Sequence, residues 1–126
     1  MEKVSLLVDT DIFIDYFNTG RFDTILENRL FVIYYSSVSE KELLSKKGLS
    51  SSEQEAIRYA LKRYRRININ NSIASVYSRL RNEHPTIDKE DALIAATAIT
   101  KKLPLVTRNY KHYRKIKELT LFTGKG

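Results

Sequence analysis

Short apolar runs alternate with amphipathic segments along this chain, and this alternation limits the possible fold more than any other feature. Each apolar run is rich in leucine or β-branched residues and is short, as is typical of a buried strand. Each amphipathic segment repeats its apolar residues at helical spacing. Strands that alternate with helices predict an α/β fold, in which a central, mostly parallel sheet is flanked by helices on both faces.

The boundaries of these elements follow from the same patterns. The first helix is expected to follow Asp9 and to end at Gly20, and the run ALIAATAI (92–99) indicates a helix that is buried on most sides. The expected strands are residues 3–8, 30–36, 67–69, 104–107 and 119–122, and the other expected helices are 21–28, 37–47, 50–66, 72–83 and 88–103.

Composition narrows the class of protein. A chain of 126 residues fits one domain with one core, so we expect a single domain over residues 1–126. The absence of cysteine excludes disulfides and thiolate metal sites and favours a reducing, cytoplasmic location. Asp9 comes too early for a signal peptide, and no apolar run approaches the roughly 20 residues that span a bilayer. We therefore expect a soluble protein with no membrane association.

Charge is divided unevenly between the two halves of the chain. Residues 1–60 contain 7 Lys/Arg and 10 Asp/Glu, whereas residues 61–126 contain 15 and 5, which together give the net charge of +7. The basic half indicates a polyanionic partner. Solvated helix faces are the alternative that charge alone leaves open.

Three aspartates interrupt the apolar stretch LLVDTDIFIDYF at residues 6–17. Asp9 follows the first strand directly, where it is either a helix cap or a functional acid. Asp11 falls in the first helical turn, where a negative charge favours the helix dipole. Asp15 lies on the same helix face as Asp11, and we expect it to be a solvated acid.

Two further acids lie near the ends of predicted strands or helices. Glu42 lies one turn into the helix that follows the second strand, as a border residue of the core or as an ordinary surface glutamate. Asp91 stands three residues after Asp88, where a capping box has its acid, but it also leads a helix that must be buried. Each acid therefore has a purely structural alternative.

Taken together, the acids indicate a metal site. The carboxyl ends of parallel strands lie at one edge of the sheet, where polar functional groups gather. Clustered carboxylates raise one another's pKa and stay ionised only beside a cation. Because all the available ligands are oxygens, Mg²⁺ or Mn²⁺ is the expected ion. A cation held by acids beside a basic surface suits hydrolysis of a phosphodiester.

The chain resembles the PIN-domain ribonucleases, and most closely the VapC-like toxins of type II toxin–antitoxin systems. Four segments in the family's order and spacing carry the resemblance: LLVDTDIFIDYF, SSVSEKELL, EDALIAATAITKKLPLVTRN and YKHYRKIKELTL. The third segment is specific, whereas the first alone is weak. The resemblance implies a three-layer PIN-like domain, a homodimer and an antitoxin protein that covers the acidic site.

The resemblance also implies roles for individual residues. It makes Asp9, Glu42 and Asp91 the catalytic, metal-binding acids. Asn109 occupies the position of a fourth acidic or amide ligand, and because it is neutral here the number of metal ions stays open. Supporting positions are Thr10, Ser39 and Thr107, with His112 at a position where relatives carry Asp or His, and with Asp11 as an additional acid near the site.

The expected activity is metal-dependent hydrolysis of RNA. Arg108 and Lys111, beside the last site strand, are candidates for contacts to the RNA backbone. Further candidates are Arg63, Arg65 and Arg66, which solvated helix-end charges explain equally well.

Three alternative functions differ in how they fit the sequence. A haloacid-dehalogenase-like phosphatase would use the D-x-D of VDTD, but it needs Thr or Val where Phe13 stands and a late acidic pair that residues 104–126 lack. A non-catalytic PIN-like module that binds RNA or protein stays open, and so does a housekeeping RNA-processing nuclease.

Overall fold

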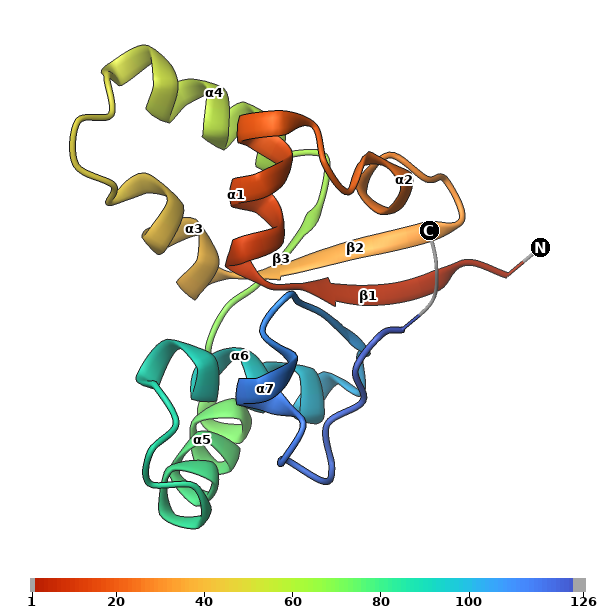
Figure 1. Ribbon diagram of the computed structural model, residues 1–126, viewed down its shortest axis with the longest axis vertical. Coiled ribbons are helices and arrows are strands. Elements are labelled where there is room, and N and C mark those ends of the chain that lie inside the picture. Colours follow the sequence, from red (N-terminus) through yellow and green to blue (C-terminus); the bar gives the residue numbers. More distant parts are fainter. Residues whose placement is uncertain (1, 124–126) are drawn as a thin grey trace.

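The computed structural model describes residues 2–123, and their centre is a four-stranded sheet in the order β3-β2-β1-β4. All three strand pairings are parallel, as the alternation of elements predicted (Figure 1). The long apolar runs form the two central strands, which are buried on both faces. The strands are β1 (Val4–Val8), β2 (Phe31–Ser36), β3 (Arg65–Ile67) and β4 (Leu105–Val106).

Helices cover both faces of the sheet and complete the predicted three layers (Figure 1). One layer contains α1 (Thr10–Thr19), α2 (Asp23–Leu26), α3 (Ser37–Leu44) and α4 (Ser51–Leu61). The opposite layer contains α5 (Asn71–Glu83), α6 (Lys89–Lys101) and α7 (Tyr110–Tyr113). Within residues 2–123, no helix has the length and apolar character that crossing a membrane requires.

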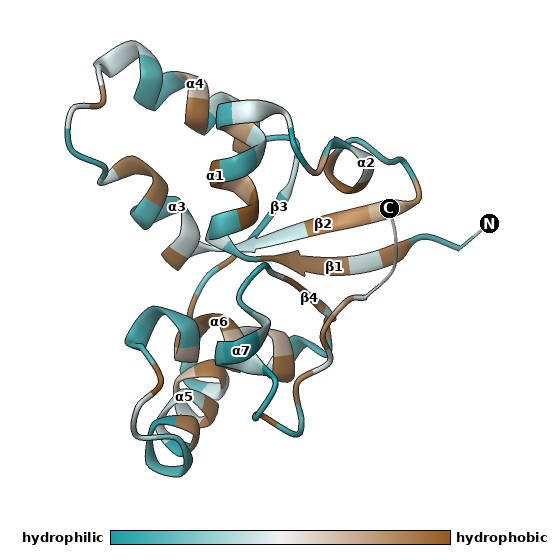
Figure 2. Cartoon of the chain, viewed as in Figure 1, coloured by the Kyte–Doolittle hydropathy of each residue, from teal (hydrophilic) through white to brown (hydrophobic). Residues whose placement is uncertain are grey.

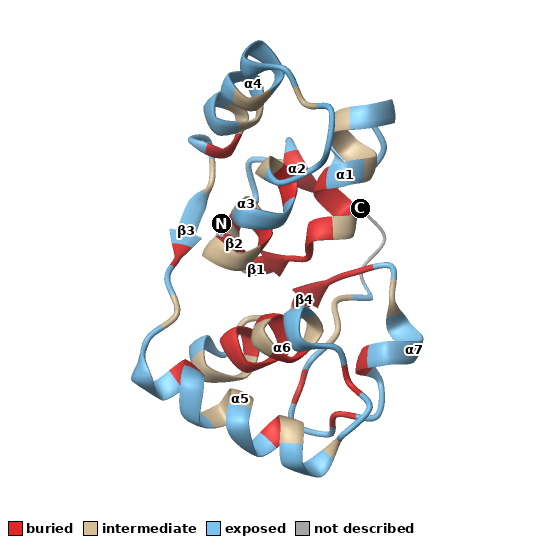
Figure 3. Cartoon of the chain, turned by 90° about the vertical axis from the view of Figure 1, so that its left-hand side faces the viewer, coloured by how far each residue is buried: buried red, intermediate tan, exposed pale blue. Residues whose placement is uncertain are grey.

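The sheet separates two hydrophobic clusters, because successive side chains of a strand point to opposite faces. Leu6 and Val8 of β1 pack with Phe13 of α1, whereas Leu7 between them packs with Ile94 of α6. Apolar residues follow the strands and the inner sides of the helices (Figure 2), and the strands and α6 hold many of the buried residues (Figure 3). The ALIAATAI run is therefore buried on most sides, as predicted.

Several predicted boundaries were wrong, and tertiary contacts explain the differences. The third strand lies at Arg65–Ile67 rather than 67–69, because the side chain of Asn70 accepts a hydrogen bond from the amide of Ile73 and starts α5. The helix predicted for 50–66 ends at Leu61, which leaves the chain free to turn into β3.

The last two predicted strands are also shorter than expected. Only Leu105 and Val106 of residues 104–107 form a strand, β4. Residues 119–122 contribute a single bridge, in which Leu121 pairs with Leu105, rather than a strand. A partner strand of two residues offers too few backbone groups for a longer ladder. The shorter helices at 23–26 and 37–44 are further corrections to the predicted ranges.

Candidate active site

The parallel sheet brings the ends of β1, β2 and β4 to one edge of the molecule. β1 pairs with both β2 and β4, and the amide of Asp9 donates to the carbonyl of Val106 at 2.9 Å. Asp9 and Thr107 therefore follow neighbouring strands side by side. Ser39 follows β2 on α3 and is fully buried.

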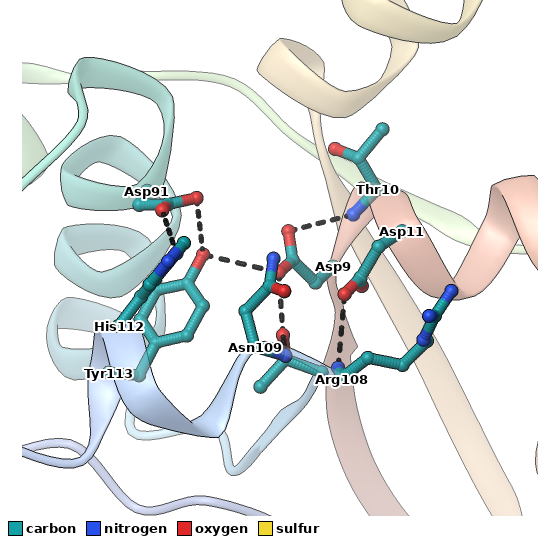
Figure 4. A network of polar contacts seen from close by, with 9 residues as sticks. Asp9, Thr10, Asp11, Asp91, Arg108, Asn109, His112 and Tyr113 are labelled. Carbon is teal, nitrogen blue, oxygen red and sulfur yellow. Dashed lines mark hydrogen bonds and ion pairs between the residues drawn. The ribbon is translucent and has the colours of Figure 1, made fainter.

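Asp9 is buried, with 4% of its surface exposed, and it accepts three hydrogen bonds. Its Oδ1 accepts from the amide of Thr10 at 2.8 Å, and its Oδ2 accepts from the hydroxyls of Thr107 at 2.8 Å and Tyr113 at 3.2 Å (Figure 4). Asp9 is also the N-cap residue of α1. The capping role is therefore confirmed, and it occupies Oδ1 alone, so that Oδ2 is directed toward Thr107 and Tyr113.

Asp91 approaches from the opposite helical layer, in the first turn of α6. Its Oδ1 lies 3.1 Å from the hydroxyl oxygen of Tyr113, and its Oδ2 lies 3.1 Å from Nδ1 of His112 (Figure 4). The side chain of Asp88 makes no capping hydrogen bond. The carboxylate of Asp91 is thus directed toward α7 and the end of β1.

Glu42 belongs to α3 and joins the site through Thr10. The hydroxyl of Thr10 lies 2.8 Å from Oγ of Ser39 and 3.2 Å from Oε1 of Glu42. Since the amide of Thr10 also donates to Asp9, one residue links the two acids. Glu42 itself is an exposed residue, unlike Asp9.

Burial and like charges disfavour ionisation of these acids. Burial raises the pKa of Asp9 to about 7, the charges of Asp11 and Asp91 add to this effect, and hydrogen bonds from Thr107 and Thr10 oppose it. Partial desolvation likewise raises the pKa of Glu42, with contributions from nearby acids that include Asp91. A bound cation would offset both effects and keep the carboxylates ionised.

The donor set suits a hard divalent cation in its chemistry, since it consists of carboxylate and amide oxygens. Among residues 2–123, however, no three His, Cys, Asp or Glu side chains are already close enough to hold one ion together. Asp9 and Asp91 converge on the hydroxyl of Tyr113, whereas Glu42 converges on Thr10. Three acids that shared one cation would therefore have to rearrange their side chains.

Arg108 lies just after β4, and its side chain is paired with an acid, so that its contact with RNA stays a prediction. Its guanidinium contacts Oδ2 of Asp15 at 2.8 Å, and its amide donates to Oδ2 of Asp11 at 3.1 Å. Arg21 also lies 3.7 Å from Asp15. The prediction that Asp15 is a solvated acid was wrong, because its carboxylate is partly buried and pairs with Arg21 and Arg108.

Asp11 contacts the loop that follows β4, where its carboxylate accepts the hydrogen bond from the amide of Arg108. Burial raises the pKa of Asp11, and its Oδ1 is buried without a hydrogen-bond partner among residues 2–123. The backbone amide of Asn109 donates to the hydroxyl of Thr107 at 3.0 Å, which orients that hydroxyl toward Asp9. Lys111 is exposed on α7.

The remaining predicted basic residues lie around the edge strand β3 rather than beside Asp9. Arg66 pairs with Glu40 at 3.5 Å, and the guanidinium groups of Arg63 and Arg65 lie over the rings of Tyr64 and Tyr34. Each of these three side chains thus already has a partner in the fold.

The acidic edge lies within a segment that matches a known family. A family model described as PIN domain matches residues 6–118. The chain belongs to the PIN-domain family. The fold that the four sequence segments predicted is thereby confirmed, and Asp9, Glu42, Asp91 and Tyr113 all lie within the matched PIN domain.

Individual relatives cover almost the whole of this PIN domain. Ribonuclease VapC1 from Methanocaldococcus jannaschii is 31% identical over 125 residues, which are 95% of this chain and 87% of the relative. The structure of VapBC2 from Rickettsia felis, bound to a promoter DNA fragment, matches with a TM-score of 0.82 and 25% identity over 97% of this chain and 100% of the matched chain. A toxin–antitoxin complex from Klebsiella pneumoniae matches with a TM-score of 0.74 and 31% identity over 91% and 95% of the two chains.

Reasoning from the sequence missed Tyr113, although it belongs to the segment YKHYRKIKELTL. Tyr113 is fully buried, and burial together with the charges of Asp9 and Asp91 raises the pKa of its phenol far above the usual range. A buried tyrosine hydroxyl needs a hydrogen-bond partner. No helix or strand was predicted for residues 108–118, and no local pattern reveals the partners of Tyr113, which are 22 and 104 positions away in the chain.

Proposed function

We propose that this protein is a metal-dependent endoribonuclease that hydrolyses phosphodiester bonds of RNA. The observation that carries the proposal is that Asp9, Glu42 and Asp91 lie at one edge of the sheet of a PIN domain, where the hydroxyl of Tyr113 links Asp9 with Asp91 and Thr10 links Asp9 with Glu42. The name of the similar protein from M. jannaschii, Ribonuclease VapC1, supports the same activity.

Asp9, Glu42 and Asp91 are the residues that would hold Mg²⁺ or Mn²⁺, and the amide of Asn109 is a weaker candidate. When bound, the cation would lower the pKa of the attacking water and neutralise charge that develops on the phosphate. The hydroxyls of Thr10 and Thr107 orient Glu42 and Asp9, and Ser39 buttresses Thr10.

The substrate side of the proposal rests on the basic half of the chain. Residues 61–126 carry 15 of the 22 Lys/Arg residues, and Lys111 is exposed on the helix that also presents Tyr113. Contacts from such side chains to phosphates supply affinity without selecting a base sequence. Arg108 would join them only if its ion pair with Asp15 opened.

We further propose that the protein is the toxin of a toxin–antitoxin pair, that it forms a homodimer and that a cognate antitoxin binds it. The similar structures from R. felis and K. pneumoniae, named VapBC2 and toxin–antitoxin complex, support this role. Induced expression of the wild-type chain should arrest bacterial growth, and Asp9→Asn should relieve the arrest. Normal growth with abundant active wild-type protein would favour a housekeeping nuclease instead.

Cleavage of structured and unstructured RNAs tests the enzymatic proposal directly. Purified wild-type protein should cleave with Mg²⁺ or Mn²⁺ and not with EDTA, and Asp9→Asn or Asp91→Asn should lower the rate by about a hundredfold or more. Asp23→Asn is the matched control, since Asp23 is an exposed acid at the start of α2. Cleavage that survives EDTA or both site substitutions would refute the metal-nuclease proposal, and RNA binding without cleavage would favour the non-catalytic module.

A further inference from the structure

The hydroxyl of Tyr113 joins the two helical layers at the acidic site. Its oxygen lies 3.2 Å from Oδ2 of Asp9, at the end of β1, and 3.1 Å from Oδ1 of Asp91, on α6 (Figure 4). Two acids that are 82 positions apart in the chain thus meet at one neutral group. Among the hydrogen bonds of residues 2–123, no other side-chain group contacts both Asp9 and Asp91.

The ring of Tyr113 is held rigidly, so its hydroxyl cannot easily leave this position. Tyr113 is 0% exposed and belongs to the same hydrophobic cluster as Leu7, Ile94 and Ile116. A packed ring leaves the hydroxyl with one accessible location, between the two carboxylates. The position of this oxygen is therefore set by the core, and the carboxylates adjust to it.

A tyrosine hydroxyl carries a single proton and can donate it to only one carboxylate at a time. Asp91 Oδ1 has no other hydrogen-bond partner among the described residues, whereas Asp9 Oδ2 also accepts from Thr107. Loss of the hydroxyl would thus leave Asp91 held only at Oδ2, by the exposed His112, while Asp9 stays attached to Thr107. Groups of this kind, which orient the ligands of a metal without binding the metal themselves, strongly affect metal affinity.

We propose that Tyr113 is a positioning residue whose hydroxyl holds Asp9 and Asp91 side by side and thereby sets the affinity of the site for a divalent cation. The inference rests on the proposed function, since it assumes that these acids bind the cation. It adds a residue that belongs to neither the acidic set nor the predicted supporting residues.

The substitution Tyr113→Phe tests the inference, because it removes the hydroxyl and keeps the ring. Tyr35→Phe is the matched control: Tyr35 is also buried, at 5% exposed, and its hydroxyl contacts a carboxylate of Glu40, at 3.3 Å, outside the proposed site. Electron paramagnetic resonance of Mn²⁺ gives the dissociation constant, and circular dichroism checks folding.

Tyr113→Phe should bind Mn²⁺ about tenfold or more weakly than wild type, whereas Tyr35→Phe should bind as wild type does. The Mn²⁺ concentration for half-maximal RNA cleavage should rise by the same factor, and the rate should recover toward wild type at saturating Mn²⁺. A merely structural role of the hydroxyl would leave the Mn²⁺ affinity of the folded variant unchanged. Unchanged or tighter binding by Tyr113→Phe would overturn the inference.

The variant Asp9→Asn distinguishes failure of the inference about Tyr113 from failure of the proposed function. If wild type binds Mn²⁺ and Asp9→Asn loses binding while Tyr113→Phe keeps it, only the inference fails. If Asp9→Asn binds Mn²⁺ as tightly as wild type, the proposed function fails as well.

A second readout does not depend on the folding of the variant. In wild-type protein labelled with ¹³Cζ-tyrosine, one of the eight tyrosine resonances should shift on titration with Mg²⁺, at a midpoint equal to the Mg²⁺ affinity. A titration that saturates the site without moving any tyrosine resonance would contradict the inference.

Discussion

The two halves of the acidic site are built in different ways. In one half, Asp9 and Asp91 converge on the fully buried Tyr113, and Asp9 is fixed by the backbone of β1 and α1. In the other half, Glu42 is an exposed helix residue that reaches the site through the hydroxyl of Thr10. The fold thus already positions Asp9 and Asp91, whereas the exposed side chain of Glu42 can move to meet a ligand.

The largest expected difference between the halves is the pH dependence of stability without metal. Burial raises the pKa of Asp9 from 3.8 to about 7, so the folded protein binds this proton more tightly than the unfolded chain. The unfolding free energy of wild type, relative to Asp9→Asn, should therefore fall as pH rises from about 4 to about 7, by up to about 4 kcal/mol.

Urea denaturation in EDTA at pH 4 and pH 8 measures this difference. Glu42→Gln is the matched comparison from the other half, and it should change the pH dependence much less because Glu42 is exposed. An equal pH dependence in wild type and Asp9→Asn would show that burial of Asp9 does not disfavour its charge.

Thr10 connects the halves, and its removal should uncouple them. Thr10→Val retains the backbone bond to Asp9 but removes the hydroxyl beside Ser39 and Glu42, so RNA cleavage at limiting Mn²⁺ should fall about tenfold. Thr97→Val serves as control, since Thr97 is a buried threonine of α6 that bonds only to the carbonyl of Leu93 among the described residues. Equal rates for the two variants would mean that Glu42 does not depend on Thr10.

The smallest expected effect concerns the ion pair beside the Asp9 half. Asp15→Asn should release the guanidinium of Arg108 and tighten RNA binding about twofold to fivefold, the scale of a partly exposed ion pair. Fluorescence anisotropy in EDTA, on an Asp91→Asn background that prevents cleavage, measures the change, with Asp23→Asn as control. Unchanged affinity would indicate that Arg108 does not contact RNA even when it is unpaired.

The sequence predicted the layers and the edge of the sheet where the acids meet, because both follow from local patterns. The apolar runs of β1 and β2 and the buried run of α6 indicate a central sheet that is covered by helices. Because the strands are parallel, the residues that follow β1 and β4 lie at the same edge. The rule predicts that Asp9 and Thr107 lie at the same edge, and the pairing of β1 with β4 in the structure places them side by side.

The sequence could not predict features that depend on how distant segments pack. The bridge at Leu121, the position of Tyr113 between two acids and the pairing of Arg108 with Asp15 each join segments separated by 16 to 104 positions. Local periodicity carries no information about such contacts. The predicted boundary of β3 was wrong for a related reason, since Asn70 caps α5 and the strand ends before it.

A crystal structure of the wild-type protein with Mn²⁺, with anomalous scattering recorded, tests the central claim most directly. We predict an anomalous peak at the carboxyl edge of the sheet, with carboxylate oxygens of both Asp9 and Asp91 as ligands. Glu42 should turn toward the same ion, which joins the two halves. A Mn²⁺-saturated crystal with no peak at Asp9, or with the ion bound elsewhere, would contradict the claim that these acids form one metal site.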